Sequence, residues 1–236
     1  MPDYVRYAVY YVPPSGPFAD FGASWLGWDV DKGAPCPHPN ITGLDVAAIT
    51  KGPRKYGFHA TLKPPMRLAP THGEVELQSA VADLADQLAP VTVDSLKPTR
   101  IGTFIALTPT GNQTALNALA ASCVIELDAF RAAPTDDELA RRRAAGLTQR
   151  QNDLLGKWGY PYVMEEFRFH MTLTGQLENE TAARAMDAVQ DLATNRIPTP
   201  VVINQIALVG ERNDGRFETI HKYSLRNNST PDPKAL

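Results

Sequence analysis

A short segment occurs twice in this chain and limits the folds that the chain can adopt. Residues 58–62 read Phe-His-Ala-Thr-Leu and residues 169–173 read Phe-His-Met-Thr-Leu, so the two histidines lie 111 positions apart. Each copy lies in a run typical of a β-strand, in which successive side chains point to opposite faces. The histidine and threonine of each copy then share one face, while the apolar residues face the other way. Each strand therefore has one polar side and one side suited to a core.

The polar side of each copy carries groups that suit phosphoryl chemistry. Histidine titrates near neutral pH, so His59 and His170 can supply a base and an acid. The hydroxyls of Thr61 and Thr172, two residues further along the same faces, can donate hydrogen bonds to phosphoryl oxygens. One His-x-Thr triplet is weak evidence, because short patterns arise by chance and a strand histidine is more often structural. Two copies with matching flanks favour a shared site.

Two cations stand beside the motifs. Lys63 is expected on the face of His59 and Thr61, and Arg168 on the face of His170. Their positive charge would stabilise the added negative charge of a phosphoryl transition state. The pattern therefore suits a phosphodiester as substrate and needs no metal.

With these flanks the chain resembles the two-histidine (2H) phosphoesterases, which carry paired His-x-Thr/Ser motifs on two pseudo-symmetric lobes. RNA 2′,3′-cyclic phosphodiesterases belong to this superfamily. The segments that carry the resemblance are 6–11 (RYAVYY), 56–65 (YGFHATLKPP) and 167–175 (FRFHMTLTG). It extends from about Tyr4 to Leu225 and is strongest to a branch of unknown function that is associated with phosphonate metabolism. The motifs are specific for the superfamily and say little about the substrate.

The resemblance implies an α+β fold of two pseudo-symmetric lobes, each an antiparallel sheet with helices on its outer side, around a central active-site cleft. The duplicated motif also favours two lobes. We expect a single bilobal domain over residues 1–225. Its expected parts are lobe one (mainly 44–130), lobe two (mainly 1–14 and 162–225) and a helical insertion (131–161), followed by a disordered tail (226–236).

Hydrophobic periodicity and capping signals predict the remaining elements. Thr71, Thr135 and Thr148 each begin the Ser/Thr-x-x-Glu/Gln pattern of a capping box. Pro64 and Pro65 are expected to end the first motif strand. The predicted strands outside the motifs are 4–12, 91–96, 100–108, 201–209 and 217–225. The predicted helices are a short one within 18–28, then 73–88, 113–130, two within the insertion, and 179–193.

Composition restricts the partners and the compartment. The net charge of −3 over 236 residues provides no overall basic field, which weakens the case for an extended nucleic-acid surface and favours a small phosphorylated substrate. An RNA end is the less favoured partner. Cys36 and Cys123 lie far apart in the sequence, in segments typical of loops and helices, as expected of reduced thiols. With no apolar leader or long apolar span in the sequence, we expect a cytoplasmic monomer that does not bind membranes.

Several residues near the motifs are candidates for substrate binding. Arg6 and Tyr10 lie on one face of the first predicted strand and could reach the site or be solvated there. Tyr56 stands just before the first motif. The insertion leads directly into the second motif strand, so it is either a substrate-facing lid or a structural addition. Its three consecutive arginines, 141–143, are expected to form a solvated helix face.

The remaining histidines are expected to be structural or peripheral. His38 stands between two prolines in an irregular covering loop. His72 falls in a capping turn. His221 lies on a predicted strand but lacks the threonine two residues onward that marks the other pair.

We therefore predict a metal-independent phosphodiesterase without a cofactor, in which His59 and His170 face each other across the cleft. One histidine would deprotonate water or a neighbouring hydroxyl and the other would protonate the leaving oxygen; the sequence does not assign these roles. Substrates implied by the resemblance are 2′,3′-cyclic nucleotides or RNA ends, or a cyclic phosphoribosyl intermediate of phosphonate breakdown. The neutral surface favours the small molecule.

Three other readings remain open at the level of sequence. The same residues could ligate or transesterify RNA ends. The cleft could bind a phosphorylated metabolite without turnover, although binding alone would not need two titrating imidazoles. The two histidines could ligate a metal, although neither motif supplies an evident third ligand.

Overall fold

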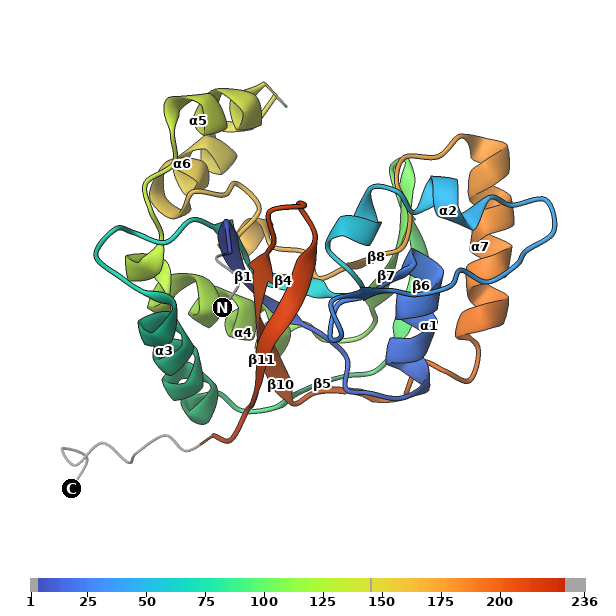
Figure 1. The fold of residues 1–236 in the computed structure, drawn as a ribbon, viewed down its shortest axis with the longest axis horizontal. Coiled ribbons are helices and arrows are strands. Elements are labelled where there is room, and N and C mark those ends of the chain that lie inside the picture. The colour runs from blue at the N-terminus through green and yellow to red at the C-terminus, as the bar shows by residue number, and fades with distance from the viewer. Residues whose placement is uncertain (1–3, 145, 228–236) are drawn as a thin grey trace.

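The computed structural model describes residues 4–144 and 146–227 (Figure 1). Its α-helices are α1 (Pro17–Leu26), α2 (Val46–Ile49), α3 (Glu74–Gln87), α4 (Thr114–Glu126), α5 (Asp136–Arg143), α6 (Gln149–Trp158) and α7 (Asn179–Ala193). Short 3-10 helices are η1 (Pro53–Lys55), η2 (Asp128–Phe130) and η3 (Met164–Glu166). The strands are β1 (Arg6–Tyr11), β2 (Trp28–Asp29), β3 (Ala34–Pro35), β4 (Ala60–Met66), β5 (Val91–Val93), β6 (Leu96–Ile101), β7 (Phe104–Pro109), β8 (Met171–Thr172), β9 (Val201–Ile203), β10 (Gln205–Glu211) and β11 (Phe217–Ser224).

Seven strands form one antiparallel sheet in the order β11-β10-β1-β4-β8-β7-β6. The two strands that carry the repeated motifs, β4 and β8, are neighbours near its centre. They pair through Ala60 and Met171, which directly follow the two motif histidines. The repeat is therefore brought together in space by a strand pair, although its copies are far apart in sequence.

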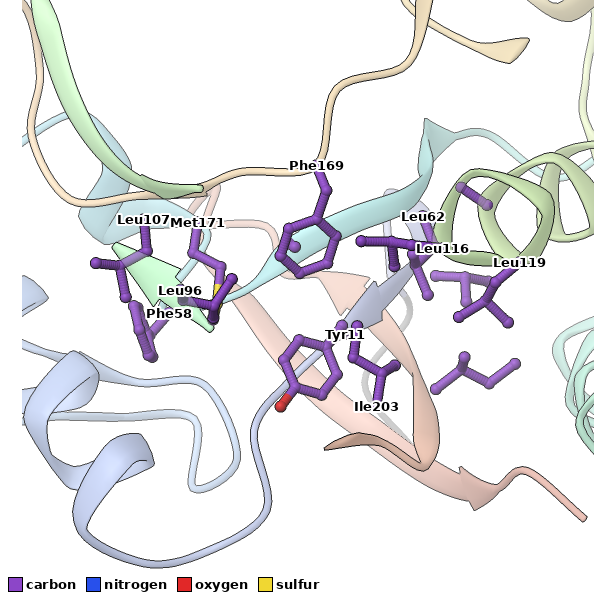
Figure 2. Close-up of a cluster of buried hydrophobic side chains, with 14 of the residues drawn as sticks. Tyr11, Phe58, Leu62, Leu96, Leu107, Leu116, Leu119, Phe169, Met171 and Ile203 are labelled. Carbon is purple, nitrogen blue, oxygen red and sulfur yellow. The ribbon is translucent and has the colours of Figure 1, made fainter. Parts of the chain in front are cut away.

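The main core lies on the side of the sheet away from the motif histidines. Tyr11, Phe58 and Leu62 meet Phe169 and Met171 there (Figure 2). Helix α4 packs against β4, α3 against β10 and β11, and α7 against β6 and β7. Figure 1 shows the resulting halves, with α3 and α4 beside one end of the sheet and α1 and α7 beside the other. The apolar faces predicted for the motif strands are thus the faces that fill the core.

A second, smaller core lies on the opposite side of β1. Ala8, Tyr10 and Val12 point into it, while the alternating Tyr7 and Val9 point into the main core. The small core also contains Trp28, Val30, Ala207, Val209 and Phe217. Strand β1 is consequently buried on both faces, and Tyr10 reaches the side of the sheet on which the motif histidines lie.

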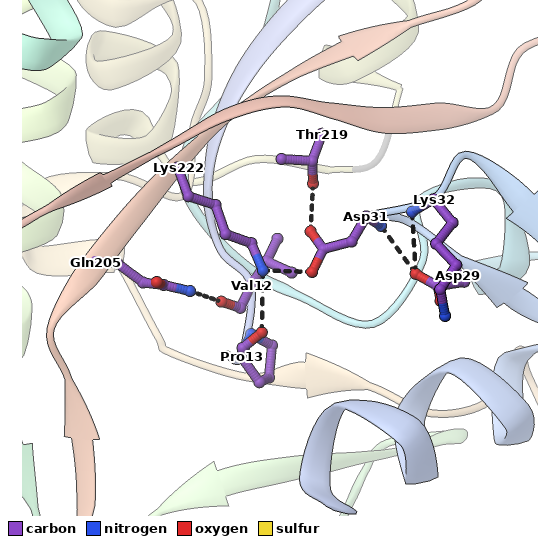
Figure 3. Close-up of polar contacts among 8 residues, drawn as sticks. All are labelled: Val12, Pro13, Asp29, Asp31, Lys32, Gln205, Thr219 and Lys222. Atoms are coloured by element: carbon purple, nitrogen blue, oxygen red, sulfur yellow. Dashed lines mark hydrogen bonds and ion pairs between the residues drawn. The ribbon is translucent and has the colours of Figure 1, made fainter. Parts of the chain in front are cut away.

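Polar contacts attach the segment after α1 to the edge strand β11 (Figure 3). Asp31 accepts a hydrogen bond from the hydroxyl of Thr219 at 2.9 Å and forms an ion pair with Lys222. The Lys222 ammonium also donates to the carbonyl of Pro13 at 3.2 Å. These bonds hold the covering segment over the small core.

The α+β class and the antiparallel sheet architecture are confirmed, with three differences in detail. Seven strands join into one sheet through β4 and β8, while β2 pairs with β3 and β5 with β9 in two small separate sheets. The predicted lobe boundaries do not follow the pairing, because β1 pairs with β4 and β7 with β8, each across the predicted division. The region 91–109 contains three strands, β5, β6 and β7, where the sequence predicted two.

The prediction that Pro64 and Pro65 end the first motif strand is wrong, because β4 continues to Met66. Its pairing with β1 is interrupted by register shifts, and irregular pairing of this kind tolerates a residue without a backbone N–H. The expected tail 226–236 falls largely outside the described residues. Its first two residues are placed: the amides of Arg226 and Asn227 donate to carbonyls of Ala85 and Leu88.

Helix α1 supports both motifs from the core side. Gly22 lets the helix approach Phe58, since a Cβ on this glycine would lie 1.9 Å from the Phe58 ring. One turn later, the Trp25 indole donates a hydrogen bond of 2.8 Å to the carbonyl of Leu173, at the end of the second motif. A single helix therefore contacts both copies of the motif.

We predict that Gly22→Ala destabilises the fold by about 1–3 kcal/mol, the usual cost of overpacking a core. The matched control is Gly156→Ala in helix α6, where no atom lies within 4 Å of the added Cβ. It should stabilise the protein by about 0.5–1 kcal/mol, because glycine is unfavourable inside a helix. Urea denaturation of both variants measures the difference. Equal stability changes would show that the contact with Phe58 does not limit the approach of α1.

Candidate active site

The register of β4 and β8 places the four motif residues on one face of the sheet. With Ala60 paired to Met171 in antiparallel register, His59 lies opposite Thr172 and Thr61 lies opposite His170. Ala60 and Met171 are buried, whereas all four motif residues are half-buried. The two histidines are diagonal neighbours, a relation that separates residues by about 7–8 Å.

His59 is held in a defined orientation. Its Nδ1 lies 2.9 Å from the carbonyl of Gly57, and its Nε2 lies 3.1 Å from the hydroxyl of Thr61. A carbonyl can only accept, so Nδ1 carries the proton of the neutral ring and Nε2 is left as an acceptor. Gly57 adopts φ +71°, and a Cβ there would lie 2.6 Å from Val30. The glycine before the motif is thus required for the carbonyl that orients the catalytic candidate.

The surroundings of His59 keep it unprotonated. The Tyr10 ring stacks on the imidazole with centroids 3.8 Å apart and planes inclined by 22°. Burial lowers the pKa of His59 to about 4, although the hydrogen bond to Gly57 opposes this effect. The charge of His170 lowers the same pKa further, so the two imidazoles sense each other electrostatically. At neutral pH, His59 is therefore a neutral imidazole that can accept a proton.

His170 has the same backbone arrangement in a different environment. Its Nδ1 lies 2.8 Å from the carbonyl of Arg168, which fixes the tautomer in the same way. The neighbouring ring is Phe104, at 6.1 Å between centroids. The sequence offered no reason to connect Phe104 with this histidine, because the contact depends on the pairing of β7 with β8.

Arg168 is exposed beside His170. Its guanidinium donates to the carbonyls of Glu165 and Phe167, each at 2.7 Å. Carbonyl groups leave its positive charge without neutralisation. The role of this cation in substrate binding therefore stays a prediction.

Lys63 is directed away from the histidines. The pairing of β1 with β4 shifts register between Thr61 and Lys63, and the resulting bulge breaks the alternation on which the prediction rested. Lys63 is 2% exposed, and its ammonium donates to the carbonyl of Val124 at 3.1 Å and lies 3.9 Å from Asp128. The predicted substrate contact is corrected: this cation is buried against the end of α4.

Burial lowers the pKa of Lys63 from 10.5 to about 8, despite the opposing effect of Asp128. The unfolded chain then binds more protons than the folded one between these values, so stability rises with pH from about 8 to about 10.5. Below pH 8 the protonated lysine carries its full penalty, at most on the order of 3 kcal/mol.

We predict that Lys63→Met is more stable than the wild type at pH 7, because it removes a buried charge. Its advantage should shrink as the pH rises from about 8 to about 10.5. Guanidinium denaturation at a series of pH values tests this. Exposed Lys97 on β6 supplies the control Lys97→Met, which should show no such trend. A variant that is less stable at pH 7 would show that the contacts of Lys63 outweigh its desolvation.

Arg6, Tyr10 and Tyr56 all lie on the side of the sheet that carries His59. Tyr56 is 37% exposed, and its ring lies 6.1 Å from His59 and 5.2 Å from Phe217. The Arg6 guanidinium lies 6.0 Å from the same Phe217 ring and forms a two-point ion pair with Glu211. Tyr10 and Tyr56 are thus brought to the site, whereas Arg6 lies nearby with its charge paired.

The insertion contributes residues that the sequence did not single out. Burial raises the pKa of Tyr160, and the nearby hydroxyls of Tyr162 and Tyr56 add to the rise while Arg142 opposes it. Burial is also the largest cause of the raised pKa of Tyr10, and Tyr160 adds to that rise. Tyr160 therefore interacts electrostatically with Tyr56 and Tyr10, the two tyrosines whose rings lie nearest His59. An aromatic residue just before a motif strand was the available signal, but its partner elements could not be identified from the sequence.

The other histidines occupy the structural roles expected of them. His38 packs under α1, with Nδ1 3.0 Å from the carbonyl of Trp25. His72 lies 3.5 Å from Glu76 and packs on Phe130 at the start of α3. His221 is exposed on β11, against Tyr223.

Residues 4–144 and 146–227 contain no group of three or more His, Cys, Asp and Glu placed to hold a metal ion. Within the same residues, no helix has the length and apolar character needed to cross a bilayer.

Comparison with known families gives one match that covers most of the chain. A family model described as "Protein of unknown function (DUF1045)" matches residues 61–218. This range contains the second motif and the insertion, and it begins at Thr61 of the first motif. It agrees with the branch of unknown function that the motifs resemble.

Two curated relatives are named ribose 1,5-bisphosphate phosphokinase PhnN. The protein from Janthinobacterium sp. (strain Marseille) is 38% identical over 219 residues, which are 89% of this chain and 48% of that protein. The protein from Laribacter hongkongensis (strain HLHK9) is 35% identical over 175 residues, which are 74% of this chain and 41% of that protein. The chain thus spans about half the length of the curated relatives it matches.

Solved structures show only a distant likeness. One is titled as a phosphoesterase, with a TM-score of 0.41 and 16% identity over 94% of this chain and 99% of that chain. Another is E. coli LigT complexed with 3′-AMP, with a TM-score of 0.42 and 16% identity over 93% of this chain and 97% of that chain.

Proposed function

This chain belongs to the DUF1045 family, and we propose that it is a metal-independent phosphodiesterase that opens a cyclic phosphodiester. The observation that supports this most is the pair of imidazoles on adjacent antiparallel strands, each with Nδ1 bonded to a backbone carbonyl. In the neutral form of both rings Nδ1 therefore carries the proton, and Nε2 is the nitrogen that can accept one. A binding site alone would not require two imidazoles oriented in this way.

In the proposed reaction His59 is the general base. Its Nε2 accepts a proton from water, whose oxygen forms a new bond to phosphorus. The bond from phosphorus to one ring oxygen breaks, and protonated His170 donates its Nε2 proton to that oxygen. Thr172 donates a hydrogen bond to a non-bridging oxygen, and Thr61 does the same once substrate turns its hydroxyl away from Nε2 of His59. The exposed charge of Arg168 stabilises the transition state. The product is a phosphate monoester, and the two histidines have exchanged protonation states.

We propose a cyclic phosphoribose as the substrate. The curated relatives are named for a kinase that acts on ribose 1,5-bisphosphate. Hydrolysis of a 1,2-cyclic phosphate on ribose 5-phosphate, with cleavage at O2, yields ribose 1,5-bisphosphate. The proposed reaction would then supply the substrate in that name, in line with the role in phosphonate catabolism that the motif resemblance implies.

We predict that His59→Ala and His170→Ala each lower kcat/KM by roughly a hundredfold or more, the usual scale of general acid or base catalysis. The assay compares hydrolysis of a cyclic phosphoribose, a 2′,3′-cyclic nucleotide and an artificial diester in the presence of a chelator. His221→Ala, on exposed β11, is the control and should retain full activity. Activity that survives both motif substitutions would refute this site, and a requirement for added metal would refute metal independence.

The lowered pKa of His59 predicts the pH profile of the free enzyme. A base must be deprotonated to act, so kcat/KM should fall only as the pH approaches about 4. An unperturbed histidine would instead give an acid limb near 6.5. Measurement of kcat/KM between pH 4 and pH 8, with enzyme stability checked at each point, tests the assignment. An acid limb near 6.5 would assign the base to a group other than His59.

A further inference from the structure

A small cleft between the sheet and the insertion has a strongly basic lining. One wall is formed by the start of β1 and the end of β4, and the other by the segment 131–142 together with Gly159. Four arginines line the cleft: Arg6, Arg67, Arg131 and Arg142. The lining contains one carboxylate, that of Glu138.

The size of the cleft suits a small anion. Its volume is about 50 Å³. A single water needs roughly 10–15 Å³ measured in this way, so the cleft holds about as much as one tetrahedral phosphoryl group with its oxygens.

Three of the arginines have carboxylate partners. Arg6 pairs with Glu211 and Arg131 pairs with Asp128, and neither of these carboxylates lines the cleft. Arg67 contacts Glu138 at 3.0 Å. A phosphate dianion entering here would meet four guanidinium groups and one carboxylate, and guanidinium groups bind phosphate oxygens in two-point contacts.

Arg142 differs from its neighbours in the run 141–143. Arg141 and Arg143 are exposed, whereas Arg142 is half-buried and lies over the Tyr160 ring at 4.5 Å from its centroid. No ion pair of Arg142 occurs among the described residues. The arginine run 141–143 was predicted to be a solvated helix face. One of its members, Arg142, instead lines the cleft.

A continuous set of contacts connects the cleft to the histidines. From Arg6, the rings of Phe217 and Tyr56 lead to His59 with successive separations of 6.0, 5.2 and 6.1 Å. On the other wall, Arg142 contacts Tyr160, which interacts electrostatically with Tyr56. Arg6 precedes Tyr10 by four residues, about 13 Å along the strand, so cleft and histidines can contact opposite ends of one small substrate.

We propose that this arginine cleft binds a phosphate monoester at the far end of the cyclic phosphodiester, with Arg142 as the specificity-determining residue. The inference rests on the proposed function and extends it, since it selects substrates with a second, non-reacting phosphate. A cyclic phosphoribose with a 5-phosphate belongs to this class. A 2′,3′-cyclic mononucleotide, which has only its cyclic phosphate, does not.

Binding is measured first, without turnover. Ribose 5-phosphate is titrated by calorimetry into the wild type, Arg142→Ala and the matched Arg143→Ala. Loss of a two-point charged contact should weaken binding roughly tenfold to a hundredfold in Arg142→Ala. Arg143→Ala should bind as the wild type does, and Arg142→Lys, which keeps charge without the planar fork, should lie between. Equal effects of the two alanine substitutions, or no binding to the wild type, would overturn the proposal.

Turnover separates this inference from the proposed function. Two substrates are compared, the cyclic phosphoribose with a 5-phosphate and the same sugar without it. The ratio of their kcat/KM values should fall at least tenfold in Arg142→Ala and stay constant in Arg143→Ala. If the enzyme turns over both sugars and Arg142→Ala leaves this ratio unchanged, the cleft proposal fails and the phosphodiesterase stands. If no cyclic phosphate is hydrolysed but ribose 5-phosphate binding depends on Arg142, the phosphodiesterase fails and the cleft stands.

Discussion

The pairing of Ala60 with Met171 determines the architecture of the candidate site. This one contact between β4 and β8 joins the two halves of the seven-stranded sheet. Its antiparallel register also sets each motif histidine opposite the threonine of the other motif. The site is therefore shared between two segments that are far apart in the chain, and neither copy of the motif forms it alone.

The alternation of side chains along a strand makes the same residues serve stability and chemistry. Phe58, Ala60 and Leu62 are buried in the main core, and the residues between them face the other side. Helix α1 then fixes both motifs, through Phe58 in the first and the Leu173 carbonyl in the second. Core packing thereby limits the freedom of the imidazoles, which catalysis by positioned groups requires.

Local patterns predicted the elements and faces that depend on neighbouring residues. Helix α7, the capping boxes at Thr135 and Thr148, and the polar faces of His59 and His170 are of this kind. Features that depend on distant strands were not predictable. The bulge that buries Lys63 arises from the pairing of β4 with β1, and no property of the segment 58–66 predicts it. The position of Arg142 depends likewise on how the insertion packs against the sheet.

Two nearly identical pentapeptides occupy unlike environments, and this difference is the asymmetry that the proposed acid and base catalysis would need. The first imidazole is stacked on a fully buried tyrosine, and burial keeps it neutral. The second lies beside an exposed arginine and a more distant ring. Because the backbone bonds of both rings are equivalent, the unlike roles cannot come from the motif itself. In the proposed reaction they would come from the burial of His59, on which Tyr10 of β1 is stacked, so a residue that would distinguish base from acid lies outside both copies of the repeat.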